Sequence, residues 1–357
     1  MVHFTREATI PHGTLYNESI RTVYTFDKSG ILDYLGHLAS AALSFMTGSM
    51  VALGGGITIG GADLFSTLGG YIMRLVSFVS SLSEEADWGV QAEDRVFSGK
   101  SIAPDLDALV RMGSDGLNQI LGIVQAKGTK SFPLADVQIR APISRPTKIV
   151  AIGQNYMDHC RECNVPVPSL PIVFAKFPST IIGPYDDILW SAQLSDEVDW
   201  EVELGVVIGK PARRVSEEAA LEYVFGYTII NDVSARDLQL GDGQWVRGKS
   251  LDTFCPLGPV IVTADEIPDP QVLGVRSWVN GEVMQESNTL EMIFNVRYLI
   301  SFLSHAFTLN PGDLIATGTP NGVGLGRTPQ VFLHDGDVVE MEIDYIGRIR
   351  NTCHIEA

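Results

Sequence analysis

From residue 148 onwards, the sequence consists largely of short apolar segments that each end at a turn-forming residue. The segments are KIVAIG, PIVFAKF, EVELGVVIG, YTIIND, GPVIVT, VRSWVNG, DLIATG and DVVEMEID. Runs of this length bounded by Gly, Pro, Asn or Asp are typical of β-strands. Only residues 156–163, 216–223 and 291–302 have helical spacing in this region. Because strands outnumber helices, we expect a strand-rich α+β fold with a rolled or sandwiched sheet, not an alternating βαβ fold.

The residues before this region predict a small N-terminal α+β domain. Residues 73–81 alternate apolar and polar side chains, and with residues 88–99 they predict a β-hairpin whose turn lies within 80–87. Residues 105–124 have helical spacing, and the Pro-bounded sequence APISRP that follows them is typical of a linker. We therefore expect a small domain over residues 73–140 and the main domain over residues 146–357.

Residues 1–72 differ in character from both predicted domains. Residues 35–62 contain no Asp, Glu, Lys or Arg, and 41–61 are long enough to span a bilayer. Six glycines among them lower the apolar density, so we expect no membrane span. The acidic residues of the first 33 positions do not fit a transit peptide. The hypothesis for residues 1–72 is an extension that is poorly ordered or an artefact of the gene prediction.

Composition limits the partners and the compartment. The formal charge is −18, from 25 Lys plus Arg against 43 Asp plus Glu. This acidity disfavours binding to nucleic acid or to an anionic membrane surface. Hydrophobic residues make up 45% and charged residues 19%, which is a globular composition. Four cysteines in so long a chain predict reduced thiols in an intracellular protein.

Two carboxylates share one face of the predicted strand at residues 199–209. The apolar residues of this segment alternate onto one face, which leaves Glu201 and Glu203 together on the other. A solvated strand face is one interpretation; burial would instead require a proton or a hard divalent cation such as Mg²⁺, Mn²⁺ or Ca²⁺. Asp232 ends the strand at residues 227–232. It could complete a three-carboxylate metal site with positions open to water and substrate.

A histidine and a carboxylate lie three residues apart in the helical segment at residues 156–163. Glu162 could orient His159 as a general base, although a surface histidine beside a helical neighbour has the same spacing. The segment also contains Cys160 and Cys163. A structural zinc site would need a second cysteine pair, and a redox disulfide would need a thioredoxin-like βαβ setting.

A glycine-rich loop and a lysine complete the candidate site. The loop at residues 317–324 could present backbone N–H groups to a carboxylate, or it could be a plain tight turn. It does not have the P-loop sequence. Lys249 could stabilise a developing oxyanion or enolate, and an ordinary surface lysine is the alternative.

These motifs, in this order, resemble the fumarylacetoacetate hydrolase family over residues 73–353. The segments that carry the resemblance are GQNYMDHCRE, KFPSTIIGP, DWEVELGVVIGK, GYTIINDVSARD, GKSLDTFCPLGP, VNGEVMQ, NTLEMIF, PGDLIATGTPNGVG and GDVVEME. Within the family, the chain is most similar to the eukaryotic fumarylacetoacetate hydrolase domain-containing protein 2 subgroup. The resemblance implies a mixed β-sandwich roll for the main, catalytic domain, usually in a homodimer.

The resemblance also implies a cofactor and a role for each motif residue. One Mg²⁺ or Mn²⁺ per subunit is implied, with Ca²⁺ as a substitute. The implied metal ligands are Glu201, Glu203 and Asp232. The implied catalytic residues are His159, Glu162 and Lys249. The implied substrate-binding residues are Arg236, Gln239 and Thr319.

The implied chemistry acts on enolisable 2-oxo or 1,3-dicarbonyl acids, small molecules that a metal ion can chelate. The subgroup implies oxaloacetate keto–enol tautomerase activity and a tendency towards mitochondria, so mitochondrial and cytoplasmic locations are both open. The alternatives are C–C hydrolysis of acylpyruvate- or fumarylacetoacetate-type substrates, oxaloacetate decarboxylation, and a catalytically inactive binding protein. Gln154 stands where many acylpyruvase relatives have Arg, which removes one anchor for a substrate carboxylate.

Overall fold

The computed structural model describes residues 2–8, 20–26, 50–51, 58–59, 73–81, 84–124 and 126–356. The chain divides into two compact units, Met1–Tyr71 and Ile72–Ala357. The described part of the first unit is four strands: β1 (Val2–Ala8), β2 (Ile20–Phe26), β3 (Met50–Val51) and β4 (Thr58–Ile59). β1 pairs with β2 and β3 pairs with β4, both antiparallel.

The remaining residues of 1–72 lie outside the described part of the chain. The hypothesis of a poorly ordered or artefactual extension therefore stays a prediction. Most of the apolar segment at 41–61 also lies outside it. Among the described residues, no helix is both long enough and apolar enough to cross a membrane.

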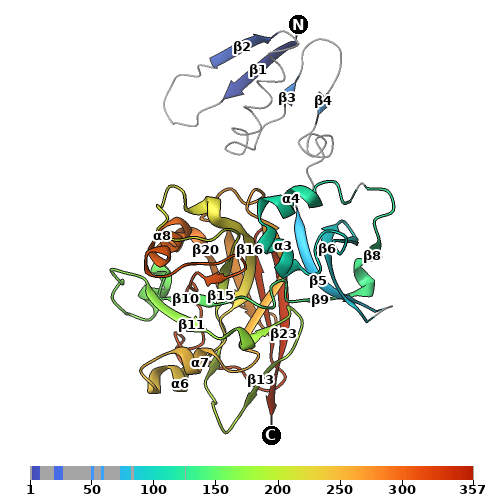
Figure 1. The fold of residues 1–357 in the computed structure, drawn as a ribbon. Helices are drawn as coiled ribbons and strands as arrows, with labels where there is room; N and C mark the ends of the chain where they lie inside the picture. The colour runs from blue at the N-terminus through green and yellow to red at the C-terminus, as the bar shows by residue number, and fades with distance from the viewer. Residues whose placement is uncertain are drawn as a thin grey trace. The chain divides into compact units, whose positions relative to one another are not determined.

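A 12-stranded mixed sheet forms the centre of the second unit (Figure 1). Its order is β11 (Ile172–Lys176), β10 (Ile149–Gly153), β21 (Leu314–Ala316), β15 (Val202–Ile208), β16 (Val224–Asn231), β18 (Cys255–Thr263), β5 (Arg74–Ser80), β6 (Ala86–Ala92), β7 (Arg95–Ser98) and β8 (Ser131–Pro133). Two further strands join it: β12 (Ile181–Ile182) pairs with β18, and β9 (Val137–Arg140) pairs with β5. β10 is parallel to β21, whereas β15 is antiparallel to both β21 and β16.

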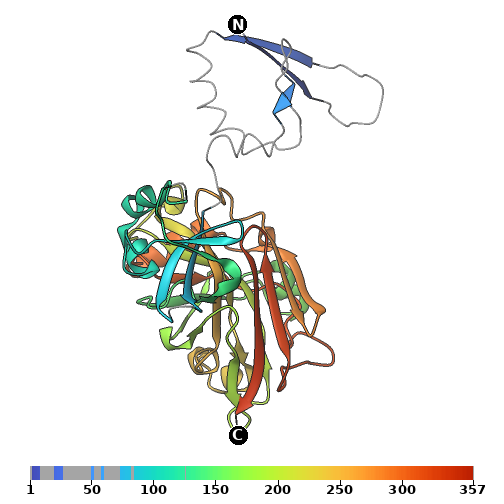
Figure 2. The ribbon, with the colours of Figure 1, turned by 90° about the vertical axis from the view of Figure 1, so that its right-hand side faces the viewer.

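A second, five-stranded sheet packs against the first. Its order is β13 (Ile188–Ser191), β23 (Gly347–Glu356), β22 (Val338–Ile343), β19 (Gly274–Val279) and β20 (Glu282–Asn288). Figure 2 shows the long red strand β23 running towards the C-terminus. A short ribbon of β14 (Val198–Asp199) and β17 (Ser234–Ala235) lies outside both sheets.

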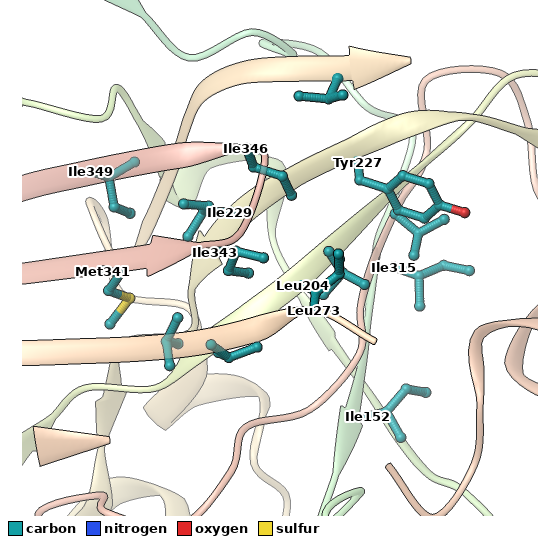
Figure 3. Close-up of a cluster of buried hydrophobic side chains, with 14 of the residues drawn as sticks. Ile152, Leu204, Tyr227, Ile229, Leu273, Ile315, Met341, Ile343, Ile346 and Ile349 are labelled. Atoms are coloured by element: carbon teal, nitrogen blue, oxygen red, sulfur yellow. The ribbon is translucent and has the colours of Figure 1, made fainter. Parts of the chain in front are cut away.

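The main hydrophobic core lies between the two sheets. Figure 3 shows Leu204, Ile229 and Ile315 of the large sheet in one cluster with Met341 and Ile349 of the smaller sheet. All five side chains are buried. Apolar side chains from two facing sheets form the core of a β-sandwich, so the predicted strand-rich α+β sandwich is confirmed.

A second core covers the opposite face of the large sheet. It joins Leu75 and Trp88 of the β5–β6 hairpin to Leu109 of α3 (Leu106–Met112) and to Ile261 of β18. The β5–β6 hairpin has its turn between residues 80 and 86, as predicted. β5 pairs directly with β18, with Leu75 opposite Ile261. Residues 73–140 and 146–357, predicted as two domains, thus share one sheet and one compact unit.

The helices differ from the predictions mainly at their ends. The predicted helix at 105–124 is two helices, α3 and α4 (Ser114–Ile120), because Gly113 between them has φ +59°. The predicted helix at 291–302 begins later, as α8 (Val296–Ala306), because the Asn295 side chain caps it by accepting from the Tyr298 N–H. The segment at 216–223 contains only the 3₁₀ turn η4 (Ala220–Tyr223).

Three further short helices belong to the site. α5 (Met157–Glu162) was predicted, whereas α6 (Arg236–Gly241) and α7 (Val246–Lys249) were not. α6 and α7, of six and four residues, were not recognised from helical spacing in the sequence. The remaining 3₁₀ turns in the described part are η2 (Leu134–Asp136), η3 (Pro178–Thr180) and η5 (Thr289–Glu291).

Candidate active site

The predicted acidic residues meet at one end of the large sheet. The pairing directions place the start of β15 beside the ends of β16, β21 and β10. Glu201 immediately precedes β15, Glu203 lies within it, and Asp232 follows β16. The Asp232 N–H donates to the Glu201 carbonyl oxygen at 3.0 Å, which continues the ladder past the last paired strand residues. Strand register therefore brings the three carboxylates together.

The alternation predicted for β15 is confirmed. Its apolar side chains lie in the core between the sheets; these are Trp200, Val202, Leu204, Val206 and Ile208. Glu201 and Glu203 point to the other face, yet they are only 5% and 1% exposed, and Asp232 is 0% exposed. The solvated strand face is therefore the wrong interpretation for this pair.

Two lysines neutralise part of this buried negative charge. Lys249 Nζ lies 2.5 Å from Glu201 Oε2 and 2.8 Å from Asp232 Oδ2. Lys176 Nζ lies 2.7 Å from Asp232 Oδ1, and both lysines are buried. Burial alone would raise the pKa of Glu201, but Arg236 and Lys249 lower it to about 2. Glu201 is therefore a carboxylate at neutral pH.

The donor set fits a divalent cation. Glu201, Glu203 and Asp232 each offer a carboxylate oxygen, and these three atoms lie within 4.8 Å of one another. Burial, and then repulsion from Asp232 and Glu201, raises the pKa of Glu203 well above its usual value. A hard cation bound by oxygens at about 2.0–2.6 Å would relieve that repulsion. The all-oxygen ligand set favours Mg²⁺, Mn²⁺ or Ca²⁺ over softer metals.

Arg236 holds the acidic cluster in place. Its Nε donates to Asp199 Oδ2 at 2.8 Å, its Nη2 lies 2.6 Å from Glu201 Oε1, and its Nη1 donates to Gln239 Oε1 at 3.0 Å. Arg236 was predicted to bind substrate. All three guanidinium nitrogens lie within 3.0 Å of protein oxygens, and the substrate-binding role of Arg236 stays a prediction.

A glycine brings Lys249 over the carboxylates. A Cβ atom at Gly248 would lie 2.5 Å from the Gln239 N atom and 2.7 Å from the Ala235 carbonyl oxygen. Only glycine therefore lets α7 approach the start of α6 this closely. Lys249 is the next residue, and the close approach sets its ammonium group between Glu201 and Asp232.

The predicted histidine–glutamate pair forms on α5. His159 Nδ1 lies 3.3 Å from Glu162 Oε2, and the Gly322 N–H donates to Glu162 Oε1 at 2.9 Å. Burial would lower the pKa of His159, but hydrogen bonds with Cys163 and Glu162 raise it to about 9. The pair is therefore a fixed group that can release and accept a proton.

The glycine-rich loop uses its N–H groups on the protein's own carboxylates. Gly318 donates to Glu203 at 2.9 Å, Gly322 donates to Glu162, and Gly324 donates to Asp199 at 2.7 Å. The sequence predicts a loop that presents N–H groups to a carboxylate. The structure adds that these carboxylates belong to the site itself. The loop therefore orients Glu203 of the acidic cluster and Glu162 of the histidine–glutamate pair.

Thr319 is held from two sides. Its hydroxyl donates to the Val202 carbonyl oxygen at 3.0 Å and accepts from Gln285 Nε2 at 2.8 Å. Gln285 Oε1 in turn accepts from the Val202 N–H at 3.1 Å. Thr319 thus ties the loop to the start of β15, and its substrate-binding role stays a prediction.

One cavity of about 610 Å³ joins these groups. Eight of the predicted site residues line it, namely His159, Glu162, Glu201, Glu203, Arg236, Gln239, Lys249 and Thr319. Asp232 is not among the lining residues; it contacts Lys249, which lines the cavity, and Lys176. Cys163, Gln154 and Arg327 also line the cavity. The structure therefore brings all the predicted site residues together.

Four contributors were not predicted. Lys176 ends a strand, Asp199 precedes the acidic pair, Gln285 lies on β20, and Arg327 follows the glycine-rich loop. A charged residue at the end of an apolar segment, as in PIVFAK, is a signal that could have indicated Lys176. The other three depend on long-range contacts that leave no local pattern.

The profile of the family described as fumarylacetoacetate (FAA) hydrolase C-terminal matches residues 148–354, more than half of the chain. The chain belongs to the fumarylacetoacetate hydrolase family. The resemblance inferred from the motifs is therefore confirmed. Every site residue described above lies within the matched range.

Relatives of this family member include enzymes and solved structures. It is 46% identical over 287 residues to oxaloacetate tautomerase fahd2, mitochondrial, of Xenopus laevis, covering 78% of this chain and 89% of the relative. The structure of fumarylacetoacetate hydrolase from Exiguobacterium antarcticum matches with a TM-score of 0.71 and 37% identity, over 80% of this chain and 100% of the other. Maleylpyruvate hydrolase from Sphingobium sp. SYK-6, in complex with manganese(II) ion and pyruvate, matches with a TM-score of 0.68 and 31% identity, over the same shares of the two chains.

Proposed function

We propose that this chain is a divalent-metal-dependent oxaloacetate keto–enol tautomerase. The observation that carries the proposal is one cavity lined both by Glu201 and Glu203 and by the His159–Glu162 pair. The Xenopus laevis relative carries this activity in its name. We propose Mg²⁺ or Mn²⁺ as the cation, with Mn²⁺ present in the maleylpyruvate hydrolase structure.

The cation would be held by Glu201, Glu203 and Asp232. When bound, it supplies Lewis-acid stabilisation of negative charge on the substrate oxygens. Lys249 contributes a fixed positive charge beside the same position, and in a buried site such a charge is worth more than in water. The chain therefore stabilises the enolate that both tautomers share.

Tautomerisation moves one proton between C3 of oxaloacetate and the oxygen on C2. The His159–Glu162 pair lines the same cavity as Glu201 and Glu203, so we assign the C3 proton to His159. Glu162 accepts from Nδ1 and is itself held by the Gly322 N–H. This arrangement fixes the ring orientation during both proton release and proton return.

Arg327 suits the second carboxylate of a dicarboxylic acid. The guanidinium group lines the cavity, and its Nη2 donates to the Met284 carbonyl oxygen at 2.9 Å. Its buried Nε has no hydrogen-bond partner among the residues that the structure describes. Gln154 at the same cavity cannot supply a cation. We therefore assign to Arg327 the carboxylate of oxaloacetate that the metal site does not hold.

The assay follows the ultraviolet absorption of enol-oxaloacetate with purified protein, with and without Mg²⁺ or Mn²⁺. We expect metal-dependent acceleration of ketonisation, lost on chelation and lost in Glu201→Gln. Pyruvate formation in step with the absorption loss would instead identify a decarboxylase. Faster cleavage of acylpyruvates would identify a C–C hydrolase.

Calorimetric titration with metal ions separates the tautomerase, decarboxylase and hydrolase from a catalytically inactive binding protein. We expect Mg²⁺ or Mn²⁺ to bind wild-type protein and to bind Glu201→Gln much more weakly. Absence of binding to the wild type would contradict every enzymatic proposal made for this cavity.

The family resemblance also supports an assembly and a compartment. We propose a homodimer, which light scattering of the purified chain would test. We propose mitochondria as the compartment because the Xenopus laevis relative is named as mitochondrial. Fractionation of cells that express the chain would test this, and recovery in the cytosolic fraction would contradict it.

A further inference from the structure

A second group of potential metal ligands lines the same cavity as the acidic cluster. His159, Glu162 and Cys163 offer a nitrogen, an oxygen and a sulfur atom that lie within 4.8 Å of one another. His159 Nδ1 is 3.3 Å from Glu162 Oε2 and 3.9 Å from Cys163 Sγ. One imidazole nitrogen therefore faces both a carboxylate and a thiol.

The nitrogen–oxygen and nitrogen–sulfur separations are close to those of a tetrahedral zinc site. With Zn–N and Zn–O distances of about 2.0–2.1 Å and Zn–S of about 2.3 Å, tetrahedral angles place N and O about 3.3 Å apart and N and S about 3.6 Å apart. The observed distances are 3.3 Å and 3.9 Å. The Glu162 oxygen and the Cys163 sulfur lie within 4.8 Å of each other, where tetrahedral geometry needs about 3.6 Å. All three residues line the cavity.

The two cysteines of the CxxC sequence have separate environments. Cys160 is 2% exposed, and its thiol faces the Gln154 carbonyl oxygen at 3.7 Å. Cys163 lines the cavity beside His159. The need for a second cysteine pair, which disfavours a structural zinc site in the sequence, does not apply to a three-ligand site with one thiolate.

We propose that His159, Glu162 and Cys163 form a second metal site, selective for Zn²⁺, that inhibits the enzyme. Binding forms a zinc–sulfur bond to Cys163 and a zinc–nitrogen bond to His159, and it releases the thiol proton and one imidazolium proton to solvent. The same cation occupies the lone pair of His159 and the carboxylate of Glu162. The pair then has no proton to give and no base to accept one. The inhibitory part rests on the proposed function; the binding part does not.

Ligand chemistry makes the two sites distinguishable. The acidic cluster offers oxygen atoms alone, which suit Mg²⁺ or Mn²⁺, whereas thiolate and imidazole favour Zn²⁺ and Co²⁺. Saturating Mg²⁺ should therefore fill the first site and leave the second free for a softer ion.

The binding test uses Co²⁺ as a spectroscopic probe, added to the full chain in excess Mg²⁺. We expect a near-ultraviolet thiolate-to-cobalt charge-transfer band that Zn²⁺ removes by displacement. Cys163→Ser should abolish the band. Glu201→Gln should retain it, since that variant alters only the acidic cluster. A missing band in the wild type, or a band that persists in Cys163→Ser, would overturn the proposal.

The inhibition test titrates Zn²⁺ against tautomerase activity in excess Mg²⁺, with each variant normalised to its own zinc-free rate. Cys163→Ser should raise the half-inhibiting Zn²⁺ concentration by at least about tenfold, in line with the loss of a metal contact. Equal sensitivity of both proteins would place inhibition at the acidic cluster and overturn the proposal. If neither protein has tautomerase activity, the proposed function fails and the cobalt band still decides whether the site exists.

Discussion

Lys249 is a buried cation that contacts two carboxylates of the proposed metal site. Lys249→Met removes this charge and leaves Glu201 and Asp232 with fewer partners. We expect a loss of about 3–5 kcal/mol in the free energy of unfolding without metal. Added Mn²⁺ should restore part of it, because a divalent cation replaces the lost charge. Thermal denaturation with and without Mn²⁺ measures both effects.

The matched control for this variant is Lys100→Met. Lys100 pairs with Glu85 at 3.8 Å, and its side chain is 41% exposed. We expect a change of less than about 1 kcal/mol there, with the same response to Mn²⁺ as the wild type. Absence of an Mn²⁺ response in both wild type and Lys249→Met would argue against a cation among these carboxylates.

Arg327 lines the cavity without a carboxylate partner among the described residues. Arg327→Met should raise the KM for oxaloacetate about 10- to 100-fold, since a hydrogen bond to a charged group is worth about 1.5–3 kcal/mol. The KM for an enolisable 2-oxo monocarboxylate should change much less. Steady-state kinetics with both substrates would check this. Arg350→Met, at an exposed position of β23, is the control.

At the residue scale, the sequence predicts the acidic cluster well because its signal is local. Two glutamates two residues apart in an apolar strand must share a face, and burial then requires compensation. Arg236 is different. Its sequence position indicates proximity to the site, but only the structure shows that its guanidinium nitrogens lie against oxygens of Asp199, Glu201 and Gln239.

The loop at residues 317–324 is the element that orients both Glu203 and Glu162. Gly322 has φ +98°, and a Cβ atom there would lie 2.0 Å from the Met284 carbonyl oxygen. Gly322→Ala should displace the loop, break the N–H bond to Glu162 and lower activity severely. Gly312→Ala is the control. Gly312 has φ +86° but no atom within 4 Å of an added Cβ, so this variant measures the backbone strain without a steric clash.

We expect Gly312→Ala to cost about 1–3 kcal/mol from its positive φ alone, and Gly322→Ala to cost about 1–3 kcal/mol more from the added clash. Denaturant titration of both variants gives the difference. Equal stabilities, together with full activity of Gly322→Ala, would mean that the loop does not position Glu162.

Elements could be predicted where their periodicity is long or their ends carry clear signals. The strands of the main domain meet this condition. The predicted helix at 105–124 is interrupted because Gly113 adopts a positive φ. Glycine allows this conformation, but its presence in a sequence does not predict it. α6 and α7 are too short for a pattern, and their packing depends on the close approach at Gly248.

At the scale of the whole molecule, one sheet spans residues that the sequence divides into two domains. A chain of residues 146–357 would lack β5, whose Leu75 packs beside Ile261 on the outer face of the large sheet. We expect that fragment to aggregate. Residues 72–357 form one compact unit that contains every proposed site residue, so this longer fragment should stay soluble and retain metal-dependent activity.

Sedimentation and the enol-oxaloacetate assay on both fragments would check this. A soluble, active fragment of residues 146–357 would instead support the domain boundary predicted from the linker sequence. The pairing of β5 with β18 could not be predicted from that sequence, since no local pattern indicates which strands of a mixed sheet become neighbours.

The parallel pairing of β10 with β21 has a consequence for synthesis on the ribosome. β10 is followed by the helix that bears His159, and β21 is followed by the loop whose Gly322 N–H holds Glu162, 160 residues further along the chain. During translation, the acidic residues and the histidine emerge well before the loop. A nascent chain therefore carries His159, Glu162 and the acidic residues without the loop that orients Glu162. The complete site can form only after residue 322 has left the ribosome.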